Sequence, residues 1–162
     1  MQLPKMDGAD LMQLAEGVFA GERDPWANAA NAAALVFEAL PDLNWAGFYF
    51  LRRGELVVGP FQGRTACVRI PLGTGVCGTA AARRATVIVP DVHDFPGHIA
   101  CDSASNSELV VPMLSGERLI GVLDLDSPRL GRFGPAEAAL CESLVERLVA
   151  ACDWRLAGID GY

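Results

Sequence analysis

Two pairs of short apolar segments, each pair joined by a tight turn, constrain the fold of this chain most strongly. The segments are Trp45–Leu51 with Glu55–Pro60, joined at Arg52-Arg53-Gly54, and Leu109–Leu114 with Arg118–Asp126, joined at Ser115-Gly116. They are rich in aromatic and β-branched residues, which favour strands, and their turns contain glycine, as hairpin turns do. The sequence therefore predicts antiparallel strand pairs.

Segments with helical periodicity lie on both sides of these strands. Apolar residues recur at helical spacing over Leu11–Phe19, Trp26–Leu40 and Pro135–Trp154, with a shorter helix expected at Val76–Arg84. Asp24 is a plausible N-cap, with Pro25 at the first helical position of the second helix. The remaining expected elements are short strands at Val68–Ile70 and Thr86–Val89 and a long loop at Asp91–Ser107, with room for one helical turn. This order predicts an α+β arrangement around an antiparallel sheet, in a single domain over residues 1–162.

The net charge of the chain limits which kinds of molecule it can bind. Thirteen basic and twenty acidic side chains give a net charge of -7, which repels nucleic-acid phosphates and anionic lipid surfaces. No segment resembles an export signal or a bilayer-spanning helix of ~18 apolar residues. We therefore expect a cytoplasmic protein with a small substrate, no nucleic-acid partner and no membrane partner.

The five cysteines divide into two groups. Cys141 and Cys152 lie on the apolar face of the predicted terminal helix and are expected to pack in the core. Cys67, Cys77 and Cys101 lie in glycine-rich or irregular segments, where backbone amides and solvent can lower the pKa of a thiol. Cys101 is the most exposed candidate nucleophile, with a buried loop thiol as its alternative interpretation.

A second candidate cluster consists of carboxylates. Strand alternation places Asp124 and Asp126 about 7 Å apart on the face that also holds Ile120 and Val122. The opposite face would hold Leu119, Gly121, Leu123 and Leu125. Glu108 could join the two aspartates if the hairpin pairs in register. In a cleft, such a cluster pushes one carboxyl toward its protonated form, whereas at a frayed strand end the aspartates would simply be solvated.

The two histidines leave a metal site open as an alternative. His93 and His98 with Cys101 form a partial ligand set, which Cys67 or Cys77 could complete. No Cys-x2-Cys pair is present, so zinc is the weaker hypothesis. Either histidine could instead stabilise a Cys101 thiolate.

Trp45 and Tyr49 are four residues apart in the first strand and therefore point to the same side of the sheet. Aromatic residues in this position usually belong to the core. They could also form a flat wall for a sulfur-bearing methyl group, because sulfur contacts ring edges favourably.

Together, these motifs resemble the free methionine-(R)-sulfoxide reductases, a GAF-domain family. The matching segments are Asn44–Tyr49, Gly59–Gly63, Ala66–Pro71, Gly75–Ala80, Gly97–Asp102, Ser105–Glu108 and Gly121–Ser127. The resemblance covers roughly residues 10 to 150 and includes the spacing of cysteines 67, 77 and 101. It implies a GAF-like fold, with the N- and C-terminal helices on one face of the sheet and a ligand pocket on the other.

The resemblance also implies a role for each candidate. Cys101 is expected to be the nucleophile, Cys67 the resolving cysteine and Cys77 a second resolving or relay thiol. The residues expected to bind the substrate are Glu108, Asp124, Asp126, Trp45 and Tyr49. The implied reaction needs no metal or organic cofactor, and thioredoxin with NADPH would recycle the enzyme. A homodimer is expected, and a non-catalytic GAF sensor and a zinc-binding regulatory domain are the competing functions.

Overall fold

A computed structural model describes residues 6–161 as one six-stranded antiparallel sheet with helices on both faces. The strands are β1 (Trp45–Arg52), β2 (Glu55–Gly63), β3 (Arg69–Pro71), β4 (Val87–Val89), β5 (Ser107–Ser115) and β6 (Arg118–Ser127). The helices are α1 (Gly8–Phe19), α2 (Pro25–Ala39), α3 (Gly75–Arg83) and α4 (Pro135–Ala151), with 3-10 turns η1 (Val92–Asp94) and η2 (Trp154–Ala157). The strand order is β3-β2-β1-β6-β5-β4 and all neighbours are antiparallel, which confirms the α+β prediction.

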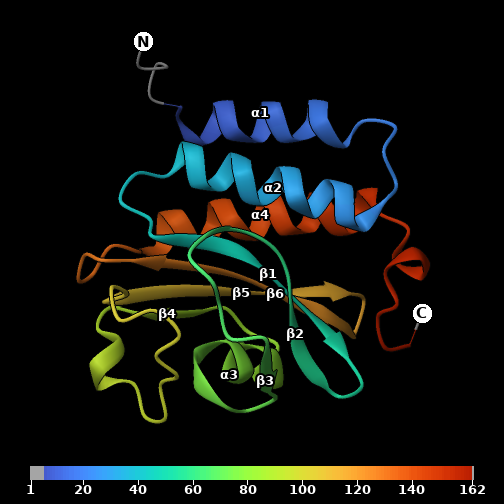
Figure 1. Ribbon diagram of the computed structural model, residues 1–162. Coiled ribbons are helices and arrows are strands. Elements are labelled where there is room, and N and C mark those ends of the chain that lie inside the picture. The colour runs from blue at the N-terminus through green and yellow to red at the C-terminus, as the bar shows by residue number, and fades with distance from the viewer. Residues whose placement is uncertain (1–5, 162) are drawn as a thin grey trace.

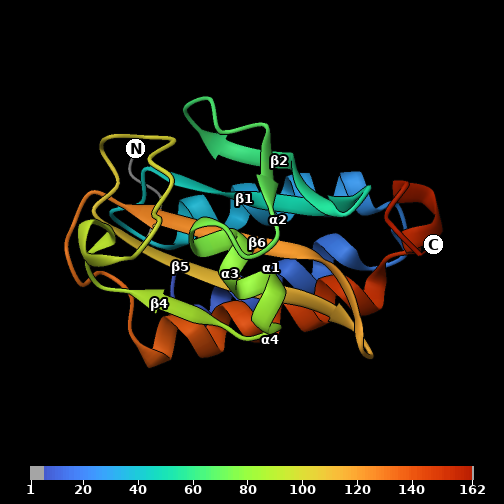
Figure 2. The same cartoon turned by 90° about the horizontal axis from the view of Figure 1, so that it is seen from below.

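The sheet lies between two layers of helices and loops (Figures 1 and 2). Each face of the sheet carries its own buried apolar cluster. α2 and α4 pack on one face, and α1 lies outside them. α3 and the connecting loops cover the opposite face, where a second, smaller apolar cluster is buried. This arrangement confirms that the N- and C-terminal helices share one face.

The helix ends follow from local hydrogen bonding. The Asp24 side chain accepts hydrogen bonds from the backbone amides of Trp26 and Ala27, at 2.8 and 3.1 Å, and Pro25 follows it as predicted. α4 ends at Ala151, so the prediction that it continues to Trp154 is wrong. Trp154 instead starts η2. Among residues 6–161, no helix combines the length and apolar character that crossing a bilayer requires.

A bulge in β6 changes the strand alternation expected from the sequence. The pairing of β5 with β6 shifts register between Met113 and Leu114, which leaves Ile120 as the extra residue. Ile120 therefore packs in the helix-side core and Leu119 in the pocket-side cluster, the reverse of the prediction. Beyond the bulge the predicted alternation is correct, and Val122 faces the pocket-side cluster.

Candidate active site

Cys67 and Cys101 are joined by a disulfide that lies at the pocket side of the sheet. Cys67 lies between β2 and β3, Cys101 lies in the loop between η1 and β5, and their Cα atoms are 5.5 Å apart. Cys77, Cys141 and Cys152 are free and buried. The core placement predicted for Cys141 and Cys152 is confirmed, since both belong to the helix-side cluster. The structure thus pairs the two cysteines expected to be the nucleophile and the resolving thiol.

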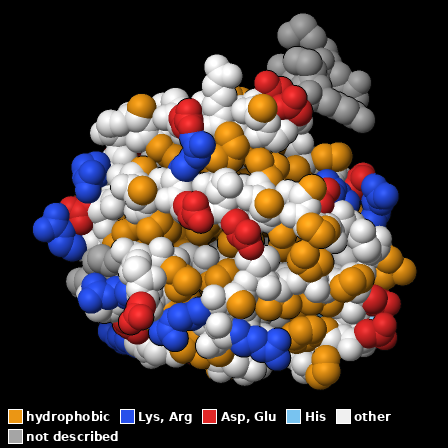
Figure 3. Space-filling view, turned by 180° about the vertical axis from the view of Figure 1, so that it is seen from behind, with side chains coloured by type: hydrophobic (Ala, Val, Ile, Leu, Met, Phe, Trp, Pro, Cys, Tyr) orange, Lys and Arg blue, Asp and Glu red, His pale blue; other side chains and the backbone are white. Residues whose placement is uncertain are grey.

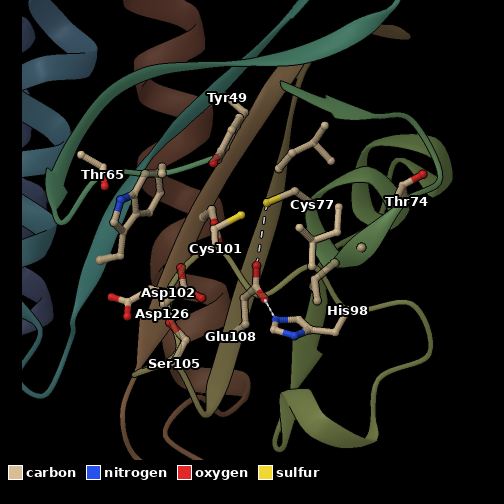
Figure 4. A pocket seen from close by; sticks show the side chains of 17 residues that line it. Tyr49, Thr65, Thr74, Cys77, His98, Cys101, Asp102, Ser105, Glu108 and Asp126 are labelled. Carbon is tan, nitrogen blue, oxygen red and sulfur yellow. Dashed lines mark hydrogen bonds and ion pairs between the residues drawn. The ribbon is translucent and has the colours of Figure 1, made fainter. Parts of the chain in front are cut away.

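A pocket lies between the sheet, α3 and the loop that carries Cys101 (Figure 4). Of the eight candidate site residues, all except Cys67 line it; those that do are Trp45, Tyr49, Cys77, Cys101, Glu108, Asp124 and Asp126. The enclosed space is about 40 Å³. An engineered cavity that binds benzene measures ~150 Å³. The disulfide form is therefore closed to a ligand of amino-acid size, and part of the wall must move before such a ligand enters.

The strand register brings the three carboxyl groups together. Glu108 on β5 pairs with Asp126 on β6, and Val110 pairs with Asp124. Glu108 and Asp124 are only 5% and 6% exposed, and Asp126 is half-buried. Asp124 is therefore not solvated at a frayed strand end, and the predicted cluster exists.

Burial and mutual repulsion alter the protonation of these carboxyls. Burial, followed by the negative charge of Asp126, raises the pKa of Glu108 to about 8. Burial also raises the pKa of Asp124 and of Asp126 well above the ordinary value, and a neighbouring carboxylate adds to each shift. At neutral pH the pocket therefore holds a neutral carboxyl that can donate a proton.

Cys77 is held inside the pocket by α3. Its Sγ donates to Oε1 of Glu108 at 3.8 Å, and burial, followed by the charge of Asp124, raises the pKa of the Cys77 thiol well above its ordinary value. The prediction that irregular surroundings lower this pKa is wrong, because Cys77 lies on a buried helix. The next residue, Gly78, allows α3 to pack this closely, because a Cβ at that position would lie 2.4 Å from the carbonyl oxygen of Pro71.

Trp45 and Tyr49 form the predicted aromatic wall. Their rings stack with centroids 5.8 Å apart, and both are buried. Each also has a polar contact that the sequence did not indicate. The Trp45 Nε1 donates to the carbonyl of Arg64 at 3.1 Å, and the Tyr49 hydroxyl donates to the carbonyl of Cys67 at 3.0 Å. The wall therefore ties the Cys67 segment to β1.

The two histidines have different positions. His98 lines the pocket, with Nε2 3.6 Å from Oε2 of Glu108, and burial lowers the pKa of its imidazole. His93 is exposed and bound to Asp91 through Nδ1 at 2.8 Å. The zinc set considered from the sequence does not form here, because Cys67 and Cys101 are bonded to each other.

A polar anchor that was not predicted from the sequence lies beside Cys101. Asn44 Nδ2 donates to Asp102 Oδ2 at 3.1 Å and to Ser105 Oγ at 3.0 Å. The backbone amide of Ala104 donates to Asp102 Oδ1 at 2.9 Å, and this bond lowers the pKa of the Asp102 carboxyl. Ser105 lies within a motif of the resemblance, but no spacing or periodicity links it to Asn44. The anchor fixes the residues that follow Cys101 to the start of β1.

An antiparallel sheet with its terminal helices on one face and a small-molecule pocket on the other defines a GAF domain. The GAF domain family model matches residues 27–153. A free methionine-R-sulfoxide reductase of Escherichia coli is 50% identical over 91% of this chain and 91% of its own length. A structure of free methionine-R-sulfoxide reductase from Neisseria meningitidis in complex with its substrate is 42% identical, with a TM-score of 0.87, over 93% of this chain and 95% of that one. A structure from Burkholderia vietnamiensis described as a proposed GAF sensor is 54% identical, with a TM-score of 0.87 and the same coverage. The chain belongs to the GAF-domain family of free methionine-R-sulfoxide reductases.

Proposed function

We propose that this protein reduces free L-methionine-(R)-sulfoxide to methionine, with Cys101 as the nucleophile. The observation that carries the proposal is a thiol pair, Cys67 and Cys101, at a pocket that holds three carboxyl groups. Family membership supports the reaction class, and the pocket chemistry supports the assignment of residues.

In the first step, the Cys101 thiolate attacks the sulfur of the sulfoxide while a protonated carboxyl assists departure of the oxygen. The protonated oxygen passes from the substrate sulfur to Cys101 Sγ, so the sulfur–oxygen bond of the substrate and the transient bond between the two sulfurs both break. Methionine leaves with the electron pair on its sulfur, and Cys101 becomes a sulfenic acid. We assign the proton to Glu108, because burial, followed by the charge of Asp126, raises its pKa to about 8, and His98 Nε2 lies 3.6 Å from its Oε2.

In the second step, the Cys67 thiol condenses with the Cys101 sulfenic acid. A disulfide forms and the oxygen leaves as water. An external dithiol, thioredoxin recycled by NADPH, then reopens the bond by thiol–disulfide exchange in the reducing cytoplasm. Cys77 serves as a reserve resolving thiol, because its raised pKa leaves little thiolate to compete with Cys67.

Substrate selection follows from charge and shape. Asp124 and Asp126 bind the free ammonium group of the amino acid, which a peptide-bound residue lacks. Trp45 and Tyr49 seat the methyl group against their ring edges. A metal or organic cofactor has no role in this scheme.

The test is an epimer-resolved assay that follows thioredoxin-dependent oxidation of NADPH. We expect turnover of the free R epimer and much weaker turnover of the S epimer and of peptide-bound sulfoxide. Cys101→Ser should be inactive, whereas Cys141→Ser, a buried thiol outside the pocket, should retain activity. Equal rates on all three substrates would contradict the pocket assignment, and ligand binding without turnover would favour a non-catalytic GAF sensor.

We also propose that the enzyme is a homodimer formed through its helical layer. Leu14 on α1 is 46% exposed. Seen from behind, apolar side chains are spread over much of the surface, among charged ones (Figure 3). Light scattering should give twice the chain mass of 17.2 kDa, and a monomer mass under dilute conditions would reject the dimer.

A further inference from the structure

Three ligand-type atoms converge among the side chains that line the pocket. One atom each from Cys77, Glu108 and Asp124 lie within 4.8 Å of one another, and all three residues are buried. Cys77 comes from α3, Glu108 from β5 and Asp124 from β6, so three separate elements build the cluster. Figure 4 shows Cys77 and Glu108 pointing toward each other across the pocket.

Asp124 provides a second, independent sign of a ligand. Asp124 is 6% exposed, and its Oδ1 accepts no hydrogen bond from an N–H group among the described residues. Its polar neighbours are the carboxyls of Glu108 and Asp126 and the Cys77 thiol. A buried oxygen without a partner is costly, on the order of 1–3 kcal/mol. It lines the pocket, so a cationic ligand in the pocket would satisfy it.

The spacing of the cluster suits a small divalent cation. Zinc bonds of about 2.0–2.3 Å in tetrahedral geometry place ligand atoms roughly 3.4–3.6 Å apart. The Cys77 Sγ and Glu108 Oε1 atoms are 3.8 Å apart, so little contraction is needed. A thiolate with two carboxylates favours zinc over magnesium or calcium, which prefer oxygen ligands alone.

We propose that Cys77, Glu108 and Asp124 form a binding site for a zinc-type divalent cation, with water as the fourth ligand. The space of about 40 Å³ that excludes an amino acid from the disulfide form still admits an ion with its water. His98, 3.6 Å from the far oxygen of Glu108, is placed to orient that carboxylate. The cation occupies Asp124, which the proposed substrate also needs, and Glu108, the proposed proton donor, so it acts as a competitor and not as a cofactor.

The test uses the protein with its Cys67–Cys101 disulfide intact, because neither of those cysteines can then bind metal. Co²⁺ is titrated into the full-length oxidised protein while the thiolate-to-cobalt absorption band is recorded, and Zn²⁺ is then added to displace it. We expect one equivalent to bind to the wild type and to Cys141→Ser, a matched control with a buried thiol elsewhere. Cys77→Ser should lose the band, and Asp124→Asn should bind about tenfold more weakly or worse.

Two results would overturn the site: no stoichiometric binding to the wild type, or an unchanged cobalt spectrum in Cys77→Ser. Circular dichroism of each variant establishes that it is folded, and Glu108→Gln provides a further ligand variant if Asp124→Asn does not fold. The titration needs no turnover. Metal binding in a protein that fails the sulfoxide assay would uphold this site and reject the proposed function.

Discussion

Glu108 makes the stability of this protein depend on pH in an unusual direction. The pKa of its carboxyl is about 8 in the folded protein, against an ordinary value of 4.5. Between these values the unfolded chain releases a proton that the folded protein keeps. The stabilisation is complete below pH 4.5 and is lost as the pH rises to about 8, so the free energy of unfolding falls with rising pH.

The size of the loss follows from the shift. One pKa unit corresponds to about 1.4 kcal/mol, so the shift sets an upper limit near 5 kcal/mol, and we expect roughly 3–5 kcal/mol. A domain of this size is stable by only about 5–15 kcal/mol, so the change is a large fraction of the total. Glu108→Gln removes this titration. It also lowers the pKa of Asp124, because Glu108 contributes to raising it.

Urea unfolding of the oxidised protein at half-unit steps from pH 5 to 9 measures the effect. The wild type should lose several kcal/mol over this range, and Glu108→Gln should lose clearly less. Glu117→Gln, on the exposed turn between β5 and β6, is the control for removal of a charge and should follow the wild type. A wild type as stable at pH 8.5 as at pH 5.5 would refute the reasoning, and so would an equal loss in Glu108→Gln.

Three further substitutions test contacts at the pocket and in the helix-side core. Tyr49→Phe removes the hydroxyl that donates to the Cys67 carbonyl, so the free energy of unfolding should fall by about 1–2 kcal/mol. Formation of the disulfide, measured by alkylation and mass spectrometry, should also slow, and an unchanged rate would show that this hydrogen bond is dispensable. Gly78→Ala places a Cβ 2.4 Å from the Pro71 carbonyl oxygen and should lower the free energy of unfolding, measured in urea, by about 1–3 kcal/mol. No change in stability would mean that α3 can move away from β3. Cys141→Ala should cost about 1 kcal/mol of stability without loss of turnover, and an inactive enzyme would contradict its core role.

Most of the fold could be predicted because its signals are local. Asp24-Pro25 marks the start of α2, because the Asp24 side chain caps the helix. Arg53 and Gly54 have the two positive φ angles, 54° and 78°, of the β1–β2 turn. The bulge at Ile120 could not be predicted, because the alternation rule assumes that every residue of a strand is paired regularly. The extra residue arises from how β6 pairs with β5. The end of α4 likewise depends on how Trp154 packs against the helix-side core.

The site was partly predictable for a similar reason. Two carboxylates on one face of β6 are visible in the sequence, and the register of a tight hairpin adds Glu108. The state of Cys77 was not predictable, because it depends on the depth to which α3 is packed against the sheet. The Asn44 anchor joins residues about sixty positions apart, and no periodicity encodes such a contact.

The closed pocket also constrains the order of events in the proposed cycle. Tyr49 holds the Cys67 segment to β1, and Asn44 holds the residues after Cys101 to the start of the same strand. With both sides anchored, the disulfide keeps the enclosed space near 40 Å³, too small for methionine or its sulfoxide. Reduction must therefore precede substrate binding, and closure of the disulfide favours release of the product. The Glu108 carboxyl keeps its proton at neutral pH in the closed form. The proton donor therefore does not need the pocket to open before it regains its proton.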